Sequence, residues 1–173
     1  LDERPPRPWT RGDLVCLAVI AVFSFATRLY KIGIPGVVLF DEVHFVSMAQ
    51  WYAGRTYFFD IHPPLGKLVL ATIVWLTGFP TDVPYRDIGK AYQHDGYFYM
   101  RLWQGCCGGL LPIIAFLTIR QLRGTSRSAC FLAGAMVILE NSFTTISRAV
   151  LLDAFLYAAM AASLLFAVKM WQD

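Results

Sequence analysis

Long apolar runs separated by short polar segments dominate this chain. The first uncharged run covers residues 14–27, and continuing it to residue 32 gives about the 20 residues that a membrane-spanning helix needs. The later apolar runs cover residues 68–81, 102–119, 128–147 and 149–168. Glu140 and Asp153 interrupt the last two of these runs. The pattern predicts an all-α integral membrane protein.

Composition supports this class. Hydrophobic residues make up 57% of the 173 residues and charged residues only 16%, whereas about a quarter of a soluble domain is charged. No stretch interleaves basic and aromatic residues as a nucleic-acid groove does, so we expect no nucleic-acid partner. The four cysteines lie inside apolar runs without metal-ligand spacing, and we interpret them as small packing residues.

The placement of basic residues predicts the topology. One cluster lies in the proline-rich segment 1–12, at Arg4, Arg7 and Arg11, and a second lies at Arg120, Arg123 and Arg127. If every apolar run crossed the membrane, these clusters would face opposite sides, which the positive-inside rule disfavours. The run 68–81 has only about 14 residues, too few for a span. We therefore expect it to lie along the interface or to dip into it.

This reasoning divides the chain into a cytosolic lead-in and a membrane domain. Residues 1–12 form the lead-in, and residues 13–173 carry the spans. The four predicted spans are 13–32, 98–119, 128–147 and 149–169. A large non-cytosolic first loop, residues 31–97, separates the first two spans and carries short interfacial helices.

Six ionisable residues are concentrated in one part of that loop. They occur in LFDEVHF and FFDIHPPLGK, as Asp41, Glu42, His44, Asp60, His62 and Lys67. A solvated loop would explain charged residues between two spans. However, a helical pattern follows the Asp-Glu pair, and Pro63 and Pro64 stiffen the chain just before a new apolar run. We interpret this segment as a built pocket.

Other charges converge on the same face of the membrane. Arg28, Arg101, Arg148 and Asp153 all lie at or near the non-cytosolic ends of predicted spans, and Glu140 lies in the outer half of one. Any one of them could form a structural ion pair, but an ionisable residue within the membrane is by default a candidate for a functional site. A transporter or channel is an alternative. An ion path would place charges through the whole depth of the membrane, whereas the charges here gather at one face. Transporters also often carry broken helices in repeated halves, a pattern that this sequence does not show.

Three motifs resemble a known family. FDEVHF, FFDIHPPLGK and SRAVLLDAFL are similar to segments of the protein O-mannosyltransferases, the dolichyl-phosphate-mannose–protein mannosyltransferases of the endoplasmic reticulum. The resemblance covers almost the whole chain after the basic lead-in and is weakest at residues 80–96. It implies a GT-C type helical transmembrane domain with its active site at the lumenal face. Full-length members have more spans and a lumenal MIR domain, so we expect this chain to be the N-terminal catalytic part.

The resemblance also implies a reaction and roles for particular residues. Mannose would move from dolichyl phosphate mannose to a serine or threonine hydroxyl of a protein, by a single displacement that inverts the anomeric carbon. Asp41 would be the general base, and Glu42 would position it or pair with Arg28. Arg28 and Arg101 would bind the donor phosphate, with Lys67 and Arg148 as weaker candidates, because guanidinium groups match phosphate oxygens.

The resemblance implies no cofactor besides the lipid-linked donor, which is a substrate. Asp41, Glu42, His44 and His62 could instead ligate a divalent cation, but the family it resembles works without a metal. We expect His44 and His62 to fix the loop by hydrogen bonding, with Pro63, Pro64 and Asp153 supporting the motifs. Members of the family pair with one another, so a related chain is the expected membrane partner. A non-catalytic subunit of such a pair remains an alternative.

Overall fold

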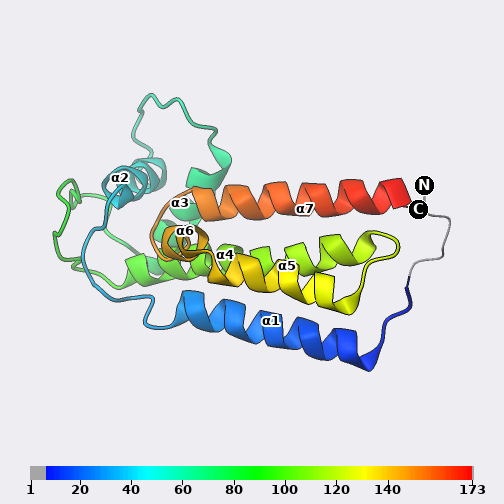
Figure 1. Ribbon diagram of the computed structural model, residues 1–173. Coiled ribbons are helices and arrows are strands. Elements are labelled where there is room, and N and C mark those ends of the chain that lie inside the picture. The colour runs from blue at the N-terminus through cyan, green and yellow to red at the C-terminus, as the bar shows by residue number, and fades with distance from the viewer. Residues whose placement is uncertain (1–6, 173) are drawn as a thin grey trace.

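The computed structural model describes residues 7–172, and α-helices make up most of this part of the chain. Figure 1 shows α1, α4, α5 and α7 side by side, with α2 and α3 at one end of them. The helices in chain order are α1 (Arg11–Leu29), α2 (Glu42–Ala53), α3 (Leu65–Thr77), α4 (Gly96–Gln121), α5 (Arg127–Leu139), α6 (Asn141–Ile146) and α7 (Asp153–Gln172). The expectation of an all-α fold is confirmed.

Helix α4 is the centre of the bundle, and it packs against α1, α5 and α7. Glycines on α4 allow this close approach, as small residues do between membrane helices. A Cβ atom on Gly108 would lie 2.3 Å from the Cβ atom of Ser147, and one on Gly109 would lie 2.5 Å from the ring of Phe25. The side chains of α1 and the segment after α6 therefore occupy the space that these glycines leave.

Among the residues that the structure describes, three helices are long and apolar enough to cross a membrane: α1, α4 and α7. The predicted span 128–147 is not a single helix, because α5 ends at Leu139 and α6 begins at Asn141. Glu140 lies at the break, where its carboxylate accepts a hydrogen bond of 2.7 Å from the backbone N–H of Phe143 and so caps α6. Helix α5 therefore has 13 residues, about 20 Å at the usual rise of an α-helix.

The start of α1, the end of α7 and the α4–α5 turn lie together at one end of the bundle (Figure 1). Arg127 contacts Asp13 at 3.4 Å, the guanidinium of Arg120 lies 3.9 Å from the centre of the Trp9 ring, and Arg123 donates to the carbonyl of Gln172. The predicted four crossings of the membrane would produce this grouping. Arg4, which belongs to the predicted cytosolic cluster, lies outside the described residues.

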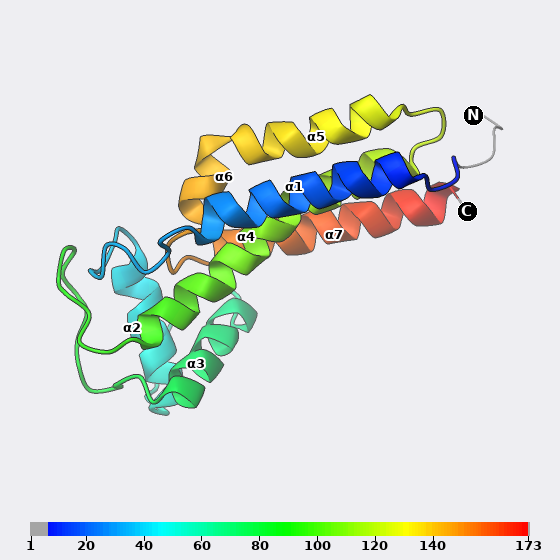
Figure 2. The same ribbon diagram turned by 90° about the horizontal axis from the view of Figure 1, so that it is seen from below.

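Helices α2 and α3 lie at the opposite end, within the predicted first loop (Figure 2). They pack against each other, and α3 also packs against α4. Helix α3 begins directly after Pro63 and Pro64, at the place where proline is best tolerated in a helix. A core of buried residues joins both helices to the loops and to α4; it includes Val38, Val46, Leu70, Tyr85 and Met100.

Candidate active site

The carboxylate of Glu42 is the polar centre of the loop region and is fully buried. Its Oε1 atom accepts hydrogen bonds from Arg101 Nε and from the backbone N–H of Val150, both at 2.8 Å. Its Oε2 atom accepts from Arg101 Nη2 and the backbone N–H of Leu39, both at 2.8 Å, and from the Tyr92 hydroxyl at 3.1 Å. Glu42 therefore connects the start of α2 to the segment before it, to the loop between α3 and α4, to α4 and to the segment between α6 and α7.

Arg101, on α4, is as fully buried as its partner Glu42. Arg101 forms a bidentate ion pair with Glu42. In addition, its Nη1 donates to the Pro35 carbonyl at 2.6 Å and its Nη2 donates to the Val37 carbonyl at 2.7 Å. All three guanidinium nitrogens are thus engaged within the protein. The expectation that Glu42 pairs with Arg28 is wrong, because the partner of Glu42 is Arg101.

Two tyrosines complete this cluster. The rings of Tyr92 and Tyr97 stack with their centres 4.4 Å apart and their planes 5° apart. The guanidinium of Arg101 lies over both, 5.1 Å from the Tyr97 ring and 5.7 Å from the Tyr92 ring. Burial and the negative charge of Glu42 raise the pKa of Tyr92 far above its ordinary value, so its hydroxyl stays protonated and donates. Sequence reasoning missed both residues, since single tyrosines in a polar loop carry no spacing signal.

Asp41, the residue before Glu42, differs from it in burial and in hydrogen bonding. It stands just before the first residue of α2 and is half-buried. Its carboxylate makes no capping hydrogen bond, and no ion pair involves it within residues 7–172. The preceding residue, Phe40, is exposed and has a φ of 37°, a conformation that non-glycine residues rarely adopt. The structure therefore holds Asp41 with an unengaged carboxylate beside a saturated one.

Lys67 closes the loop formed by the DIHPPLGK segment. Its ammonium group, which is fully buried, forms an ion pair with Asp60 and donates to the His62 carbonyl at 2.9 Å. The other oxygen of Asp60 lies 3.0 Å from Nδ1 of His62. Burial lowers the pKa of Lys67 below its ordinary value. The expected hydrogen bonding of His62 is therefore present, and Pro63 and Pro64 lie inside the loop that this pair closes.

Arg28 and Arg148 lie together at the end of α1. Arg28 is fully buried and donates to Thr27 Oγ1 and to the Val137 carbonyl, both at 3.2 Å, while its Nε has no acceptor. Arg148 is half-buried and donates to the carbonyls of Thr27 and Arg28 at 3.1 and 3.0 Å. Neither guanidinium has a carboxylate partner within the described part of the chain. These are the two predicted phosphate ligands whose charge the protein leaves unneutralised.

The remaining predicted residues are His44 and Asp153. His44 is exposed on α2, and its ring forms no hydrogen bond among residues 7–172. Asp153 occupies the first turn of α7 and is half-buried. Within the described chain, no three His, Cys, Asp or Glu side chains are placed to hold a metal ion. The four residues of the alternative cation site are thus not gathered, since Glu42 faces Arg101 and His62 faces Asp60.

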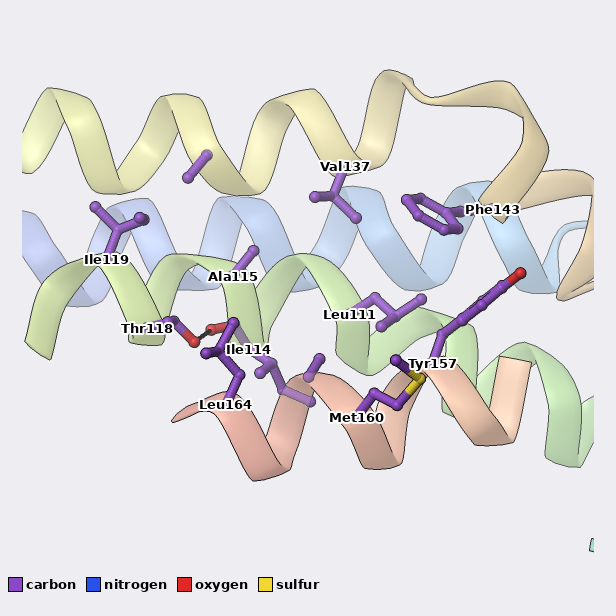
Figure 3. Close-up of a pocket in the computed structure, with 12 residues that line it drawn as sticks. Leu111, Ile114, Ala115, Thr118, Ile119, Val137, Phe143, Tyr157, Met160 and Leu164 are labelled. Carbon is purple, nitrogen blue, oxygen red and sulfur yellow. Dashed lines mark hydrogen bonds between the residues drawn. The ribbon is translucent and has the colours of Figure 1, made fainter. Parts of the chain in front are cut away.

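An apolar groove of about 640 Å³ runs along the bundle (Figure 3). Helix α4 forms its floor, and α5 and α7 form its sides, with Phe143 and Tyr157 at one end. The hydroxyl of Thr118 is turned to the carbonyl of Ile114 on its own helix, at 2.8 Å. The lining therefore suits hydrocarbon and offers little to water.

Comparison with known proteins identifies the family of this chain. Residues 18–173 match the family described as dolichyl-phosphate-mannose-protein mannosyltransferase. This chain belongs to that family. Mannosyltransferases with similar sequences include protein O-mannosyl-transferase 2 of Danio rerio, 39% identical over 153 residues. Another is dolichyl-phosphate-mannose--protein mannosyltransferase 4 of Schizosaccharomyces pombe, 34% identical over 160 residues.

A solved mannosyltransferase shares the fold of this chain. It is the Saccharomyces cerevisiae protein O-mannosyltransferase Pmt1-Pmt2 complex bound to the sugar donor, with a TM-score of 0.88 and 34% identity over 95% of this chain. The GT-C fold expected from the resemblance is therefore confirmed. The match covers 88% of this chain and 20% of the Danio rerio relative, 91% and 20% for the Schizosaccharomyces pombe relative, and 22% of the solved chain. The chain thus spans about a fifth of the length of these mannosyltransferases.

Proposed function

We propose that the full-length protein carrying this chain transfers mannose from dolichyl phosphate mannose to serine and threonine hydroxyls of proteins. The unengaged carboxylate of Asp41, fixed beside the saturated Glu42, is the observation that carries this proposal. A general base needs a carboxylate that is held in place but not consumed by internal partners. Family membership and the donor-bound relative supply the reaction class.

In the proposed reaction, Asp41 accepts the proton of the acceptor hydroxyl as its oxygen attacks the anomeric carbon of mannose. The bond between that carbon and the phosphate oxygen breaks, and dolichyl phosphate leaves with the electron pair. A single displacement of this kind inverts the anomeric configuration. The leaving phosphate is weakly basic, so it requires a positive charge more than a proton.

Arg28 and Arg148 are the cations that we assign to the donor phosphate. Both lack a carboxylate partner among the described residues, and a guanidinium fork matches two phosphate oxygens. Arg101 and Lys67 are reassigned as positioning residues, because Glu42 and Asp60 already neutralise them. Arg101 holds Glu42 at the start of α2 and thereby fixes the backbone next to Asp41.

The proposed location is the endoplasmic reticulum membrane, with the site at its lumenal face. Helices α2 and α3 would then lie at the lumenal interface, and the end that holds Arg120, Arg123 and Arg127 would face the cytosol. Positive-inside orientation favours this placement. A related family member is the proposed partner, as in the Pmt1-Pmt2 complex.

The test uses the full-length protein with its membrane partner and follows transfer from dolichyl phosphate mannose to a threonine-rich peptide. Asp41→Asn should abolish transfer while expression and pairing stay as in the wild type. The equivalent change in the partner is the control that separates the two chains. If only the partner's change removes transfer, this chain is a non-catalytic subunit. If the wild type transfers to none of several acceptors, the donor assignment fails.

A further inference from the structure

A second cavity, of about 440 Å³, lies on the exposed side of α2. Its lining residues are Val43, His44, Ser47, Met48, Trp51 and Arg86. Five of the six come from α2, and Arg86 comes from the loop between α3 and α4. Unlike the groove in the bundle, this cavity lies outside the long helices and beside the aqueous loops.

The helical phase of α2 places the cavity next to Asp41. Asp41, His44, Met48 and Trp51 follow one another at intervals of three, four and three residues, so they share one side of the helix. The buried residues Glu42, Val46, Ala49 and Gln50 occupy the opposite side. A ligand lying in the cavity would therefore run along α2 and reach the candidate base at the first turn.

The lining chemistry suits an extended polypeptide. Met48 and Trp51 supply an apolar surface, and methionine adapts its shape to varied partners. Arg86 is exposed, and within residues 7–172 its guanidinium forms no hydrogen bond or ion pair. It can therefore receive a backbone carbonyl or an acidic side chain.

The donor fits this cavity less well than the acceptor. A dolichyl chain needs a continuous apolar wall, whereas this wall carries His44 and Arg86 at the aqueous loops. The unneutralised cations at the end of α1, Arg28 and Arg148, already provide for the phosphate. A soluble acceptor approaches from water, and the exposed side of α2 faces that approach.

We propose that this cavity is the acceptor subsite, and that the peptide segment around the modified serine or threonine lies along α2. An acidic residue near that hydroxyl would meet Arg86. The inference rests on the proposed function and deepens it, because it assigns acceptor preference to residues outside the catalytic cluster.

The experiment measures transfer by the full-length protein with its partner to two peptides. Each has a single threonine, flanked on both sides by glutamate in one peptide and by lysine in the other. Arg86→Glu should raise the KM for the glutamate-flanked peptide about five-fold and lower that for the lysine-flanked peptide, as expected for an exposed ion pair. The KM for the donor should not change. Arg55→Glu is the matched control, since Arg55 is an exposed arginine in the loop between α2 and α3 and does not line the cavity.

The outcomes separate this assignment from the proposed function. Unchanged peptide preference in Arg86→Glu overturns the subsite, and so does an equal shift in Arg55→Glu, which would show a general charge effect. A raised KM for the donor overturns it by assigning the cavity to the donor. In each of these cases transfer by the wild type still supports the mannosyltransferase. If Arg86→Glu does not assemble, Arg86→Gln should show a smaller shift in the same direction.

Discussion

The same chemical change at two adjacent residues should have opposite consequences. Glu42→Gln and Asp41→Asn each replace a carboxylate by an amide of nearly the same size. Glu42 is fully buried and accepts five hydrogen bonds, whereas the Asp41 carboxylate is half-buried and accepts none from residues 7–172. We expect Glu42→Gln to destabilise the protein and Asp41→Asn to abolish transfer without destabilising it.

The magnitude for Glu42→Gln follows from its partners. If the new amide nitrogen replaces Oε1, it faces the donors of Arg101 and Val150. If it replaces Oε2, it faces the donors of Arg101, Leu39 and Tyr92. Either orientation opposes donor to donor and leaves the charge of Arg101 uncompensated. Breaking a buried pair in this way costs about 3–5 kcal/mol, whereas Asp41→Asn should change stability by less than about 0.5 kcal/mol.

The assay is thermal unfolding of the purified full-length protein in detergent, followed by intrinsic fluorescence, together with mannose transfer by the same samples. Glu42→Gln should unfold well below the wild type, and Asp41→Asn should unfold with it. The reasoning is refuted if Glu42→Gln unfolds at the wild-type temperature. It is also refuted if Asp41→Asn loses as much stability as Glu42→Gln, since Asp41 would then be a structural residue.

Three further changes test other parts of the structure. Tyr92→Phe removes one of the five hydrogen bonds to Glu42 and should cost about 1 kcal/mol in thermal unfolding; an unchanged melting temperature would contradict that contact. Gly108→Ala drives a methyl group against Ser147 and should cost about 1–3 kcal/mol by the same measurement, and a neutral effect would show that the helices can separate. Arg28→Met keeps the buried volume but removes the charge, so the KM for the donor should rise about ten-fold or more; an unchanged KM would assign the phosphate to other groups.

The general architecture of the chain was predictable because hydropathy and helix length report directly on membrane segments. The first, second and last predicted spans correspond to α1, α4 and α7. Glu140 shows where this reasoning ends: hydropathy predicts only an interruption within one helix, whereas the carboxylate of Glu140 caps a new helix. Capping by a residue inside an apolar run depends on local backbone geometry, which hydropathy does not contain.

The sequence motifs predict candidate site residues but only partly their pairing. The motifs identified Asp41, Glu42 and Lys67 as a group, yet they could not assign a partner to each charge. Glu42 pairs with Arg101, which lies 59 positions away in the chain. Tyr92 came from the region that resembled the family least. Long-range pairing is set by tertiary packing, and a single sequence carries no record of it.

The contacts of Glu42 have a consequence for the order of events during synthesis. The carboxylate needs donors from positions 39, 92, 101 and 150, so its shell cannot be complete until residue 150 has left the ribosome. A nascent chain that has finished α2 and α3 still lacks Arg101 and would bury an uncompensated charge if it folded there. The start of α2, and Asp41 with it, therefore becomes ordered only after α4 has entered the membrane and the segment before α7 has been made. We expect chains that end before residue 150 to leave Asp41, the proposed base, without a fixed position.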